Sequence, residues 1–154
     1  MNLEHEFTFR TAVSGPHVVG EGAYGTRHYF EMTNGVMEGA RLNAQTMGCA
    51  ADWMLVGSDG FMRMDVRLQL AMCDGAVMLA RYHGLAEGND HLQNALRAGR
   101  STDYDDQCIR TIWQLESGNP RYAWVNRSVF VGEGRACARD DGTSGFEHRV
   151  YRAA

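Results

Sequence analysis

Three residues near the middle of the chain carry side chains suited to acid–base chemistry: Asp52, Arg67 and Tyr82. A carboxylate can act as a general base, a phenol can give or take a proton, and a guanidinium can stabilise a developing oxyanion. Two Asp-Gly pairs, Asp59-Gly60 and Asp74-Gly75, separate them, and each is flanked by apolar residues, which is a strong β-hairpin signal. If each pair forms a two-residue turn, three antiparallel strands result, and the three side chains lie opposite one another on one face.

Two acids are candidates for the partner of Arg67. The same register places Met54 opposite Asp65, and Asp65 lies two residues from Arg67 on the same face. If this face meets solvent, the row is a cross-strand ion pair that contributes no more than about 1 kcal/mol. If it faces a barrel interior, burial raises the pKa of the acid while the Arg67 guanidinium lowers it, and the row becomes a candidate catalytic site. The direction in which Arg67 points therefore decides whether the row is a surface ion pair or a candidate catalytic site.

The opposite face of these three strands is predicted to be wholly apolar. Its members are Trp53, Leu55, Met62, Met64, Val66, Leu68, Leu70, Met72, Val77 and Leu79. If the polar row points into a barrel, this apolar face points outward and needs cover, which predicts a homo-oligomer. A monomer would instead place the apolar face inside and the polar row in water.

A second mixed patch is predicted from two later segments, 108–116 and 121–132, as strands joined by a four-residue loop. In that register Trp113 faces Trp124, and Thr111 faces Asn126. Flat apolar surface with two hydrogen-bonding groups is typical of a wall that orients a ligand. The predicted substrate-binding residues are Trp113, Trp124, Asn126, Thr111 and Tyr122, together with Met54; ordinary barrel filling is the alternative.

The composition narrows the chemistry. All fifteen basic residues of the 154 are arginine, so a Schiff-base lysine, a pyridoxal-phosphate anchor and a P-loop lysine are excluded. The net charge of −4 gives no basic nucleic-acid footprint. The six histidines show no metal-binding spacing, and the sequence 20–25, although it matches G-x-G-x-x-G, is not followed by a helix. We therefore expect no metal, no cofactor and no nucleic-acid partner.

The remaining pattern predicts a single all-β domain over residues 1–154. Strands are expected at 3–13, 26–32, 39–47 and 145–151, with a hairpin at Asn34-Gly35, a bulge at Gly48 and one short helix within 87–99. Eight to nine strands with frequent turns are typical of an antiparallel barrel or sandwich. Four cysteines without paired spacing, and no signal peptide or apolar run of membrane length, favour a cytoplasmic protein without a membrane partner.

Several short motifs resemble a family of small proteins known as domain of unknown function thirty-two thirty-seven. They include Ala51-Asp52-Trp53, Asp65-Val66-Arg67, Arg110-Thr111 and Tyr122-Ala123-Trp124, and the likeness runs over most of the chain. The resemblance implies a closed antiparallel β-barrel similar to lipocalin and allene oxide cyclase barrels, usually associated into oligomers, and it implies no activity. Trp113 departs from the family pattern, which more often has proline there.

Three functional hypotheses follow. The first is a cofactor-independent lyase, dehydratase, isomerase or cyclase, including C–C cleavage such as deformylation, that acts on a small aromatic or apolar molecule. Asp52 or Asp65 would take a proton, Arg67 would stabilise negative charge and Tyr82 would donate a proton. The second is a non-catalytic carrier or sensor that binds small hydrophobic ligands in the interior of the same predicted barrel. The third is a structural oligomerisation module with a filled barrel.

Overall fold

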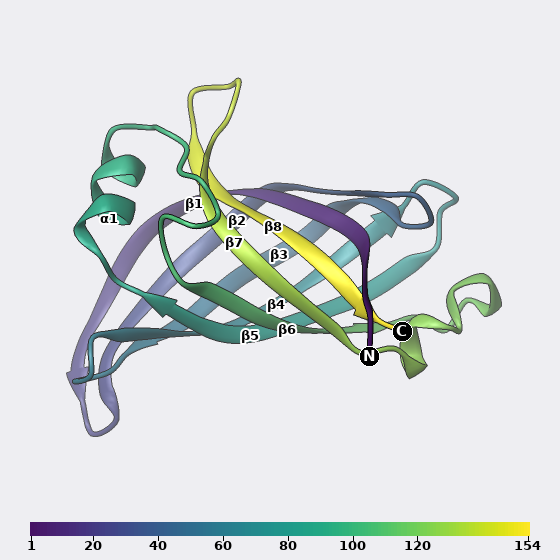
Figure 1. Cartoon of the computed structure of the whole chain (residues 1–154), viewed down its shortest axis with the longest axis horizontal. Coiled ribbons are helices and arrows are strands. Elements are labelled where there is room, and N and C mark those ends of the chain that lie inside the picture. Colours follow the sequence, from purple (N-terminus) through teal and green to yellow (C-terminus); the bar gives the residue numbers. More distant parts are fainter.

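Eight antiparallel strands close into a barrel in the computed structural model, which describes residues 1–154. Each strand pairs with its neighbours in sequence, and β8 pairs with β1 to close the ring (Figure 1). The strands are β1 (Leu3–Gly22), β2 (Gly25–Gly39), β3 (Asn43–Val56), β4 (Phe61–Met72), β5 (Val77–Glu87), β6 (Ile109–Glu116), β7 (Phe130–Ala138) and β8 (Ser144–Ala153). The predicted all-β barrel is confirmed, and the sandwich alternative is wrong.

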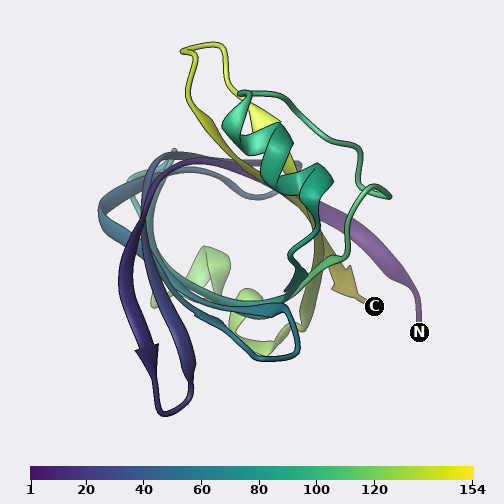
Figure 2. The same cartoon turned by 90° about the vertical axis from the view of Figure 1, so that its left-hand side faces the viewer.

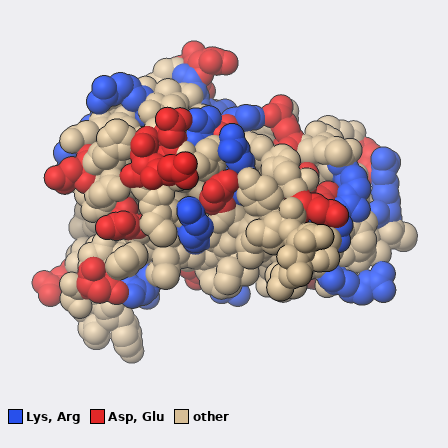
Figure 3. Space-filling model, in the orientation of Figure 1, with Lys and Arg blue, Asp and Glu red and all other residues tan.

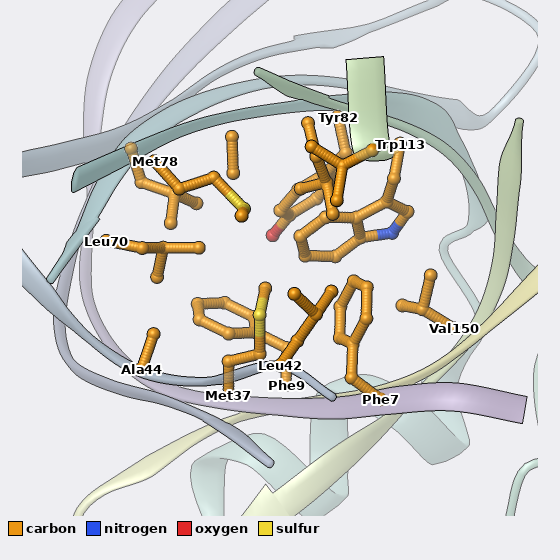
Figure 4. Close-up of a cluster of buried hydrophobic side chains, with 14 of the residues drawn as sticks. Phe7, Phe9, Met37, Leu42, Ala44, Leu70, Met78, Tyr82, Trp113 and Val150 are labelled. Carbon is orange, nitrogen blue, oxygen red and sulfur yellow. The ribbon is translucent and has the colours of Figure 1, made fainter. Parts of the chain in front are cut away.

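Alternating side chains fill the barrel from within. Strand β6 shows the period of two most clearly, because every second residue from Ile109 to Leu115 is buried and those between are exposed. Twenty buried side chains form one apolar cluster to which every strand contributes, and Figure 4 shows several of them converging on the barrel axis. This cluster therefore blocks any channel that would run through the barrel from end to end.

The two ends of the barrel differ. At one end the inward side chains are fully buried, including Leu42, Leu70, Met78, Leu115 and Tyr122. Towards the other end several inward side chains are only half-buried: Val13, Phe30, Met62, Met64 and Phe146. We call these the filled end and the open end.

The predicted helix is confirmed as α1 (Asp90–Arg97), capped by Asn89, whose side chain accepts a hydrogen bond from the Leu92 N–H. Leu92 and Ala95 pack against Ala86, Ile109 and Ala136 of the strands. In Figure 2, which shows the left-hand side of Figure 1, α1 lies at the rim of the near end of the barrel. It therefore covers part of the open end.

The first two strands are longer than predicted. Pro16 does not end β1, which runs on to Gly22 and forms a projecting hairpin arm with β2, and Asn34-Gly35 is not a hairpin turn. Asn34 instead adopts a positive φ of 51° within β2, where the pairing with β3 is interrupted between Glu31 and Val36. The bulge predicted at Gly48 is confirmed by its φ of 66° and by the register shift there.

The segment after β6 is not the predicted strand. Two short 3-10 helices, Pro120–Tyr122 and Val125–Arg127, precede β7. Asn119 accepts a hydrogen bond from the Arg121 N–H at 3.0 Å, and proline supplies a helical φ at the first position of the turn. As a result β7 begins at Phe130, nine residues later than the predicted strand at 121.

None of the helices has the length and apolar character that crossing a membrane requires. Acidic and basic side chains alternate with uncharged surface over the face in Figure 3, without a large field of one sign.

Closure of the barrel depends on a close approach of β1 and β8 at Gly145. A Cβ atom at this position would lie 1.8 Å from the Thr11 carbonyl oxygen. We expect Gly145→Ala to force the two strands apart and to lower the free energy of unfolding by about 1–3 kcal/mol. Urea denaturation measures this, with Gly118→Ala as the control because a Cβ at Gly118 meets no atom within 4 Å. Equal stability of the two variants would contradict the expectation.

Candidate functional site inside the barrel

The three central strands are joined by loops of three residues, not two. The Gly57 N–H donates to the Phe61 carbonyl at 2.9 Å, and the Met72 N–H donates to the Ala76 carbonyl at 2.8 Å, so three residues lie within each loop. The last of them, Gly60 or Gly75, has a positive φ of 79° or 85°. A type I turn followed by a glycine in the left-handed region is the usual three-residue hairpin. Each loop therefore shifts the register by one residue from the prediction.

This shift changes the centre of the predicted row. Asp52 pairs with Val66, Val66 pairs with Tyr82, and Tyr82 pairs with Trp113. Arg67 instead lies between Ala51 and Arg81 on the outer face, with its side chain 60% exposed. The predicted alignment of Asp52, Arg67 and Tyr82 is wrong. The two one-residue errors cancel across the three strands, so Asp52 and Tyr82 still share a face, which is the interior.

The residues of the predicted apolar face lie on both sides of the sheet. Met64, Val66, Leu68, Leu70 and Met72 point inward as part of the core or packed against it. Trp53, Val77 and Leu79, which the prediction placed with them, are exposed on the outer surface.

Asp65 also lies outside. Its carboxylate is 3.9 Å from the Arg67 guanidinium and 3.5 Å from that of Arg81, and all three side chains are substantially exposed. Such a surface group contributes at most about 1 kcal/mol. Asp65 and Arg67, both predicted as catalytic candidates, therefore do not reach the interior.

Asp52 is a buried carboxyl group without a cationic partner. It is 7% exposed, and one carboxylate oxygen accepts a hydrogen bond of 3.1 Å from the Asp65 N–H. Burial raises the pKa of Asp52 to about 6, the Asp65 N–H opposes this rise, and the negative charge of Asp65 adds to it. A pKa close to neutrality is the range in which a carboxylate acts best as a general base.

Tyr82 stacks on Trp113, with 4.1 Å between ring centroids and an interplanar angle of 26°. Burial first, and the nearby charge of Asp52 second, raise the pKa of the Tyr82 hydroxyl well above its usual value. It therefore keeps its proton at all physiological pH values and can only donate or share it. Figure 4 shows the Tyr82 oxygen directed into the barrel.

His148 on β8 is the interior group that the sequence did not single out. It is 1% exposed, and its ring centroid lies 5.2 Å from Tyr82 and 5.8 Å from Trp113. Burial lowers the pKa of His148 to about 4, so its imidazole is neutral, and its Nδ1 has no hydrogen-bond partner. Gly134 makes room for it, since a Cβ there would lie 2.9 Å from that Nδ1. The alternation of Phe146, His148 and Val150 along the strand was the sequence signal that could have placed His148 on the inward face.

Trp113 and Thr111 lie inside as predicted, but they face different partners. Thr111 pairs with Gly132 and Trp113 with Phe130, and the Trp113 indole N–H donates to the Thr111 hydroxyl at 2.9 Å. A Cβ at Gly132 would lie 2.6 Å from that hydroxyl oxygen. Met54 is also buried, on the same face as Asp52.

The other three predicted binding residues lie outside this site. The Tyr122 hydroxyl donates a hydrogen bond of 3.0 Å to Asp74 at the filled end. The Arg41 guanidinium lies over the Trp124 ring, with its Cζ 3.8 Å from the ring centroid. Asn126 ties its loop together by two hydrogen bonds of 2.9 Å with the backbone of Ser117. The predicted facing of Trp124 with Trp113, and of Asn126 with Thr111, is wrong because the chain forms 3-10 turns there.

The resulting site is a small polar group in an apolar enclosure. Asp52, Tyr82 and His148 supply one carboxyl, one phenol and one neutral imidazole, while Trp113 and Met54 supply apolar surface. No group of three or more His, Cys, Asp or Glu side chains gathers in a geometry that could hold a metal ion. The arrangement can move protons and donate hydrogen bonds.

Comparison with known proteins identifies relatives along the whole chain. The family model described as "Protein of unknown function (DUF3237)" matches residues 1–153. A UPF0311 protein of Clostridium acetobutylicum is 26% identical over 132 residues, which cover 85% of this chain and 84% of that protein. A crystal structure of a β-barrel-like protein from Acinetobacter baumannii superposes with a TM-score of 0.72 at 27% identity, covering 97% of this chain and 95% of the other.

A more distant similarity is to a fungal structure described as an enzyme from Penicillium herquei. It superposes with a TM-score of 0.68 at 14% identity, covering 98% of this chain and 92% of that one. At this level of identity the two proteins share the fold.

Proposed function

The chain belongs to the DUF3237 family, for which no function is established, and we propose that it is an acid–base enzyme acting on a carbonyl compound. The substrate is a small, flat, largely apolar molecule that enters the open end of the barrel. The reaction starts by removal of a proton from the carbon next to the carbonyl. Isomerisation and elimination are the two outcomes that this step allows.

The observation that supports this proposal most strongly is the environment of Asp52. A carboxyl group without a cationic partner is expensive to bury in an apolar core, and such groups are concentrated at functional sites. A purely structural role would be served by an apolar residue at the same position. Asp52 also lies near a second buried titratable group, since its charge raises the pKa of the Tyr82 hydroxyl.

The roles follow from the protonation states. Above pH 6 most of the Asp52 carboxyl is ionised and can accept the proton as the C–H bond breaks. The electron pair moves to the carbonyl oxygen, and the neutral Tyr82 hydroxyl donates a hydrogen bond to the resulting enolate. Return of the proton to another carbon completes an isomerisation, and departure of a β-hydroxyl as water or of another leaving group completes an elimination.

The walls favour an aromatic or similarly flat substrate. Trp113 and Tyr82 form a stacked pair, and Phe30, Met54 and Met64 lie on inward positions nearer the open end. Methionine side chains adapt to ligands of different shape. The Nδ1 of neutral His148, which lacks a partner, is available for one hydrogen bond with a polar substituent. The fungal enzyme of the same fold is consistent with a catalytic use of such a barrel.

Proton abstraction is tested by solvent exchange. The protein is incubated in deuterium oxide with a panel of aryl ketones and β-hydroxy ketones, and incorporation of deuterium next to the carbonyl is followed by NMR. We expect wild-type protein to exchange at least one class of compound, and Asp52→Asn to slow this exchange by about 10²–10⁴-fold because the general base is lost. The wild-type rate should rise with pH, with its midpoint near pH 6, and should level off about one pH unit higher, following ionisation of Asp52.

Asp65→Asn is the matched control on the plateau, where Asp52 is ionised with or without the nearby Asp65 charge, since the Asp65 side chain lies on the outer face and only its backbone N–H contacts the site. It should leave the exchange rate within a factor of about 3. Binding of the panel by wild-type protein without any exchange would contradict the proposal and favour a carrier of hydrophobic ligands. Equal effects of the two substitutions would also contradict it.

A further inference from the structure

The outer face of β4, β5 and β6 exposes large apolar side chains. Leu79 and Leu85 on β5 are 44% and 46% exposed, and Ile112 on β6 is 51% exposed. Beside Leu85 and Ile112 the surface is hollowed by about 870 Å³, between Arg63 at one side and Tyr151 at the other. Exposed apolar side chains around a hollow are typical of an interaction surface.

Two charged groups at one side of this face, Arg110 and Glu116, form no ion pair within the chain. Arg110 donates only to the backbone carbonyl of Ile109. The side chains of Asp65 and Arg67 are 40% and 60% exposed and approach each other no closer than 3.9 Å, while Arg81 lies 3.5 Å from the Asp65 carboxylate. Both signs of charge therefore remain available to a second molecule.

The register arranges these groups in four rows across the three strands. From the open end the rows are Arg63–Leu85–Arg110, Asp65–His83–Ile112, Arg67–Arg81–Gln114 and Gln69–Leu79–Glu116. A two-fold axis that runs across the strands, midway between the second and third rows, exchanges the first row with the fourth. It brings Leu85 over Leu79 of a second copy, and Arg110 over Glu116 of that copy.

The same axis brings Asp65 over Arg67 of the second copy. An isologous contact needs this kind of self-complementarity, in which residue i meets residue j and j meets i. Leu85 then meets Leu79, and each of these two acids meets a guanidinium. In the two central rows Ile112 lies over Gln114 of the second copy, and His83 lies over Arg81. The side chains of Leu79 and Glu116 of the second copy would enter the hollow beside Leu85 and Arg110.

We propose that the outer face of β4, β5 and β6 is a dimer interface that pairs with a second copy of this chain about this axis. The contact places Leu79 against Leu85 and Arg110 against Glu116 twice in each dimer. It is independent of the interior site, since all of these side chains point away from the barrel axis.

Charge reversal tests the arrangement. Sedimentation equilibrium over a concentration series gives the dimer dissociation constant for wild type, Arg110→Glu, Glu116→Arg and the double variant. We expect wild type to be a dimer and each single variant to raise the dissociation constant by about 100-fold, because each creates two like-charge contacts. The double variant restores opposite charges and should return the constant to within about tenfold of wild type.

Val18→Asp is the control, because Val18 is 63% exposed on the β1–β2 arm, away from the interface, and should leave the constant unchanged. Circular dichroism establishes that each variant is folded. A monomeric wild-type protein overturns the proposal. So does a wild-type dimer in which the double variant is as weak as the single variants, or in which Val18→Asp weakens association as much as Arg110→Glu.

Discussion

Asp52→Asn is expected to make the folded protein more stable at pH 7 and above, by up to about 3 kcal/mol. The pKa of Asp52 is about 6 in the folded protein, against 3.8 for an unperturbed aspartate. Because the carboxyl binds its proton more tightly in the folded protein than in the unfolded chain, its ionisation destabilises the folded protein. The loss is about 1.4 kcal/mol for each unit by which folding raises the pKa. Asparagine avoids this loss and can still accept the hydrogen bond from the Asp65 N–H.

The sign of the effect fixes its pH dependence. Below pH 3.8 the carboxyl is protonated in both states and the difference between wild type and Asp52→Asn should be small. The advantage of the variant should grow between pH 3.8 and 6 and stay constant above that. Urea unfolding of wild type and Asp52→Asn across this range measures the difference in free energy of unfolding, because the contributions of all other titratable groups cancel between the two proteins. Asp65→Asn is the control for loss of a surface carboxylate. A variant less stable than wild type at pH 8 would show that the Asp52 carboxylate supports the fold.

Trp113→Ala is expected to cause the largest loss of stability of any substitution discussed, about 3–5 kcal/mol. Trp113 is 2% exposed and contacts Phe7, Phe9, Tyr82 and His148 edge-on or stacked. Its removal leaves a cavity between the two ends of the barrel, and the rigid ring of strands limits collapse around it.

The matched control is Trp124→Ala. Trp124 is half-buried in the loop before β7, where it packs on Phe130 and under the Arg41 guanidinium, so its removal should lower stability by only about 1 kcal/mol. Chemical denaturation of both variants gives the two values. Similar losses for the two tryptophans would contradict the assignment of Trp113 to the core and Trp124 to the periphery.

Local sequence signals predicted the fold well. Alternation in 3–13 and 108–116, the capped helix after Glu87 and the bulge at Gly48 all depend on neighbours within a few residues, and the structure confirms each of them. Glycine-rich turns between such segments leave a closed antiparallel sheet as the arrangement that satisfies the strand edges.

The register was less predictable because an Asp-Gly pair suits two kinds of loop. It fits a two-residue turn with both residues at positive φ, and equally a three-residue loop in which only the glycine has positive φ. In the structure the aspartate side chains of both loops accept hydrogen bonds from the N–H two residues on, at 3.1 Å for Asp59 and 3.2 Å for Asp74. A difference of one residue moved Arg67 from the predicted site to the surface.

The position of His148 and the 3-10 turns near Trp124 needed tertiary information. Proline at 120 marked a loop, but nothing local specified how long it would be. His148 is a single histidine in an alternating strand, and only closure of β8 against β1 and β7 brings it beside Tyr82.

The difference between the two ends of the barrel has a kinetic consequence under the proposed function. The filled end offers no passage, so substrate and product share one entrance beside α1. A second reactant could not enter while the first was bound, and product would have to leave before the next substrate arrived. A barrel interior that is open at one end only suits reactions in which a single molecule rearranges or loses a small fragment. It also makes the product a competitive inhibitor with respect to the substrate.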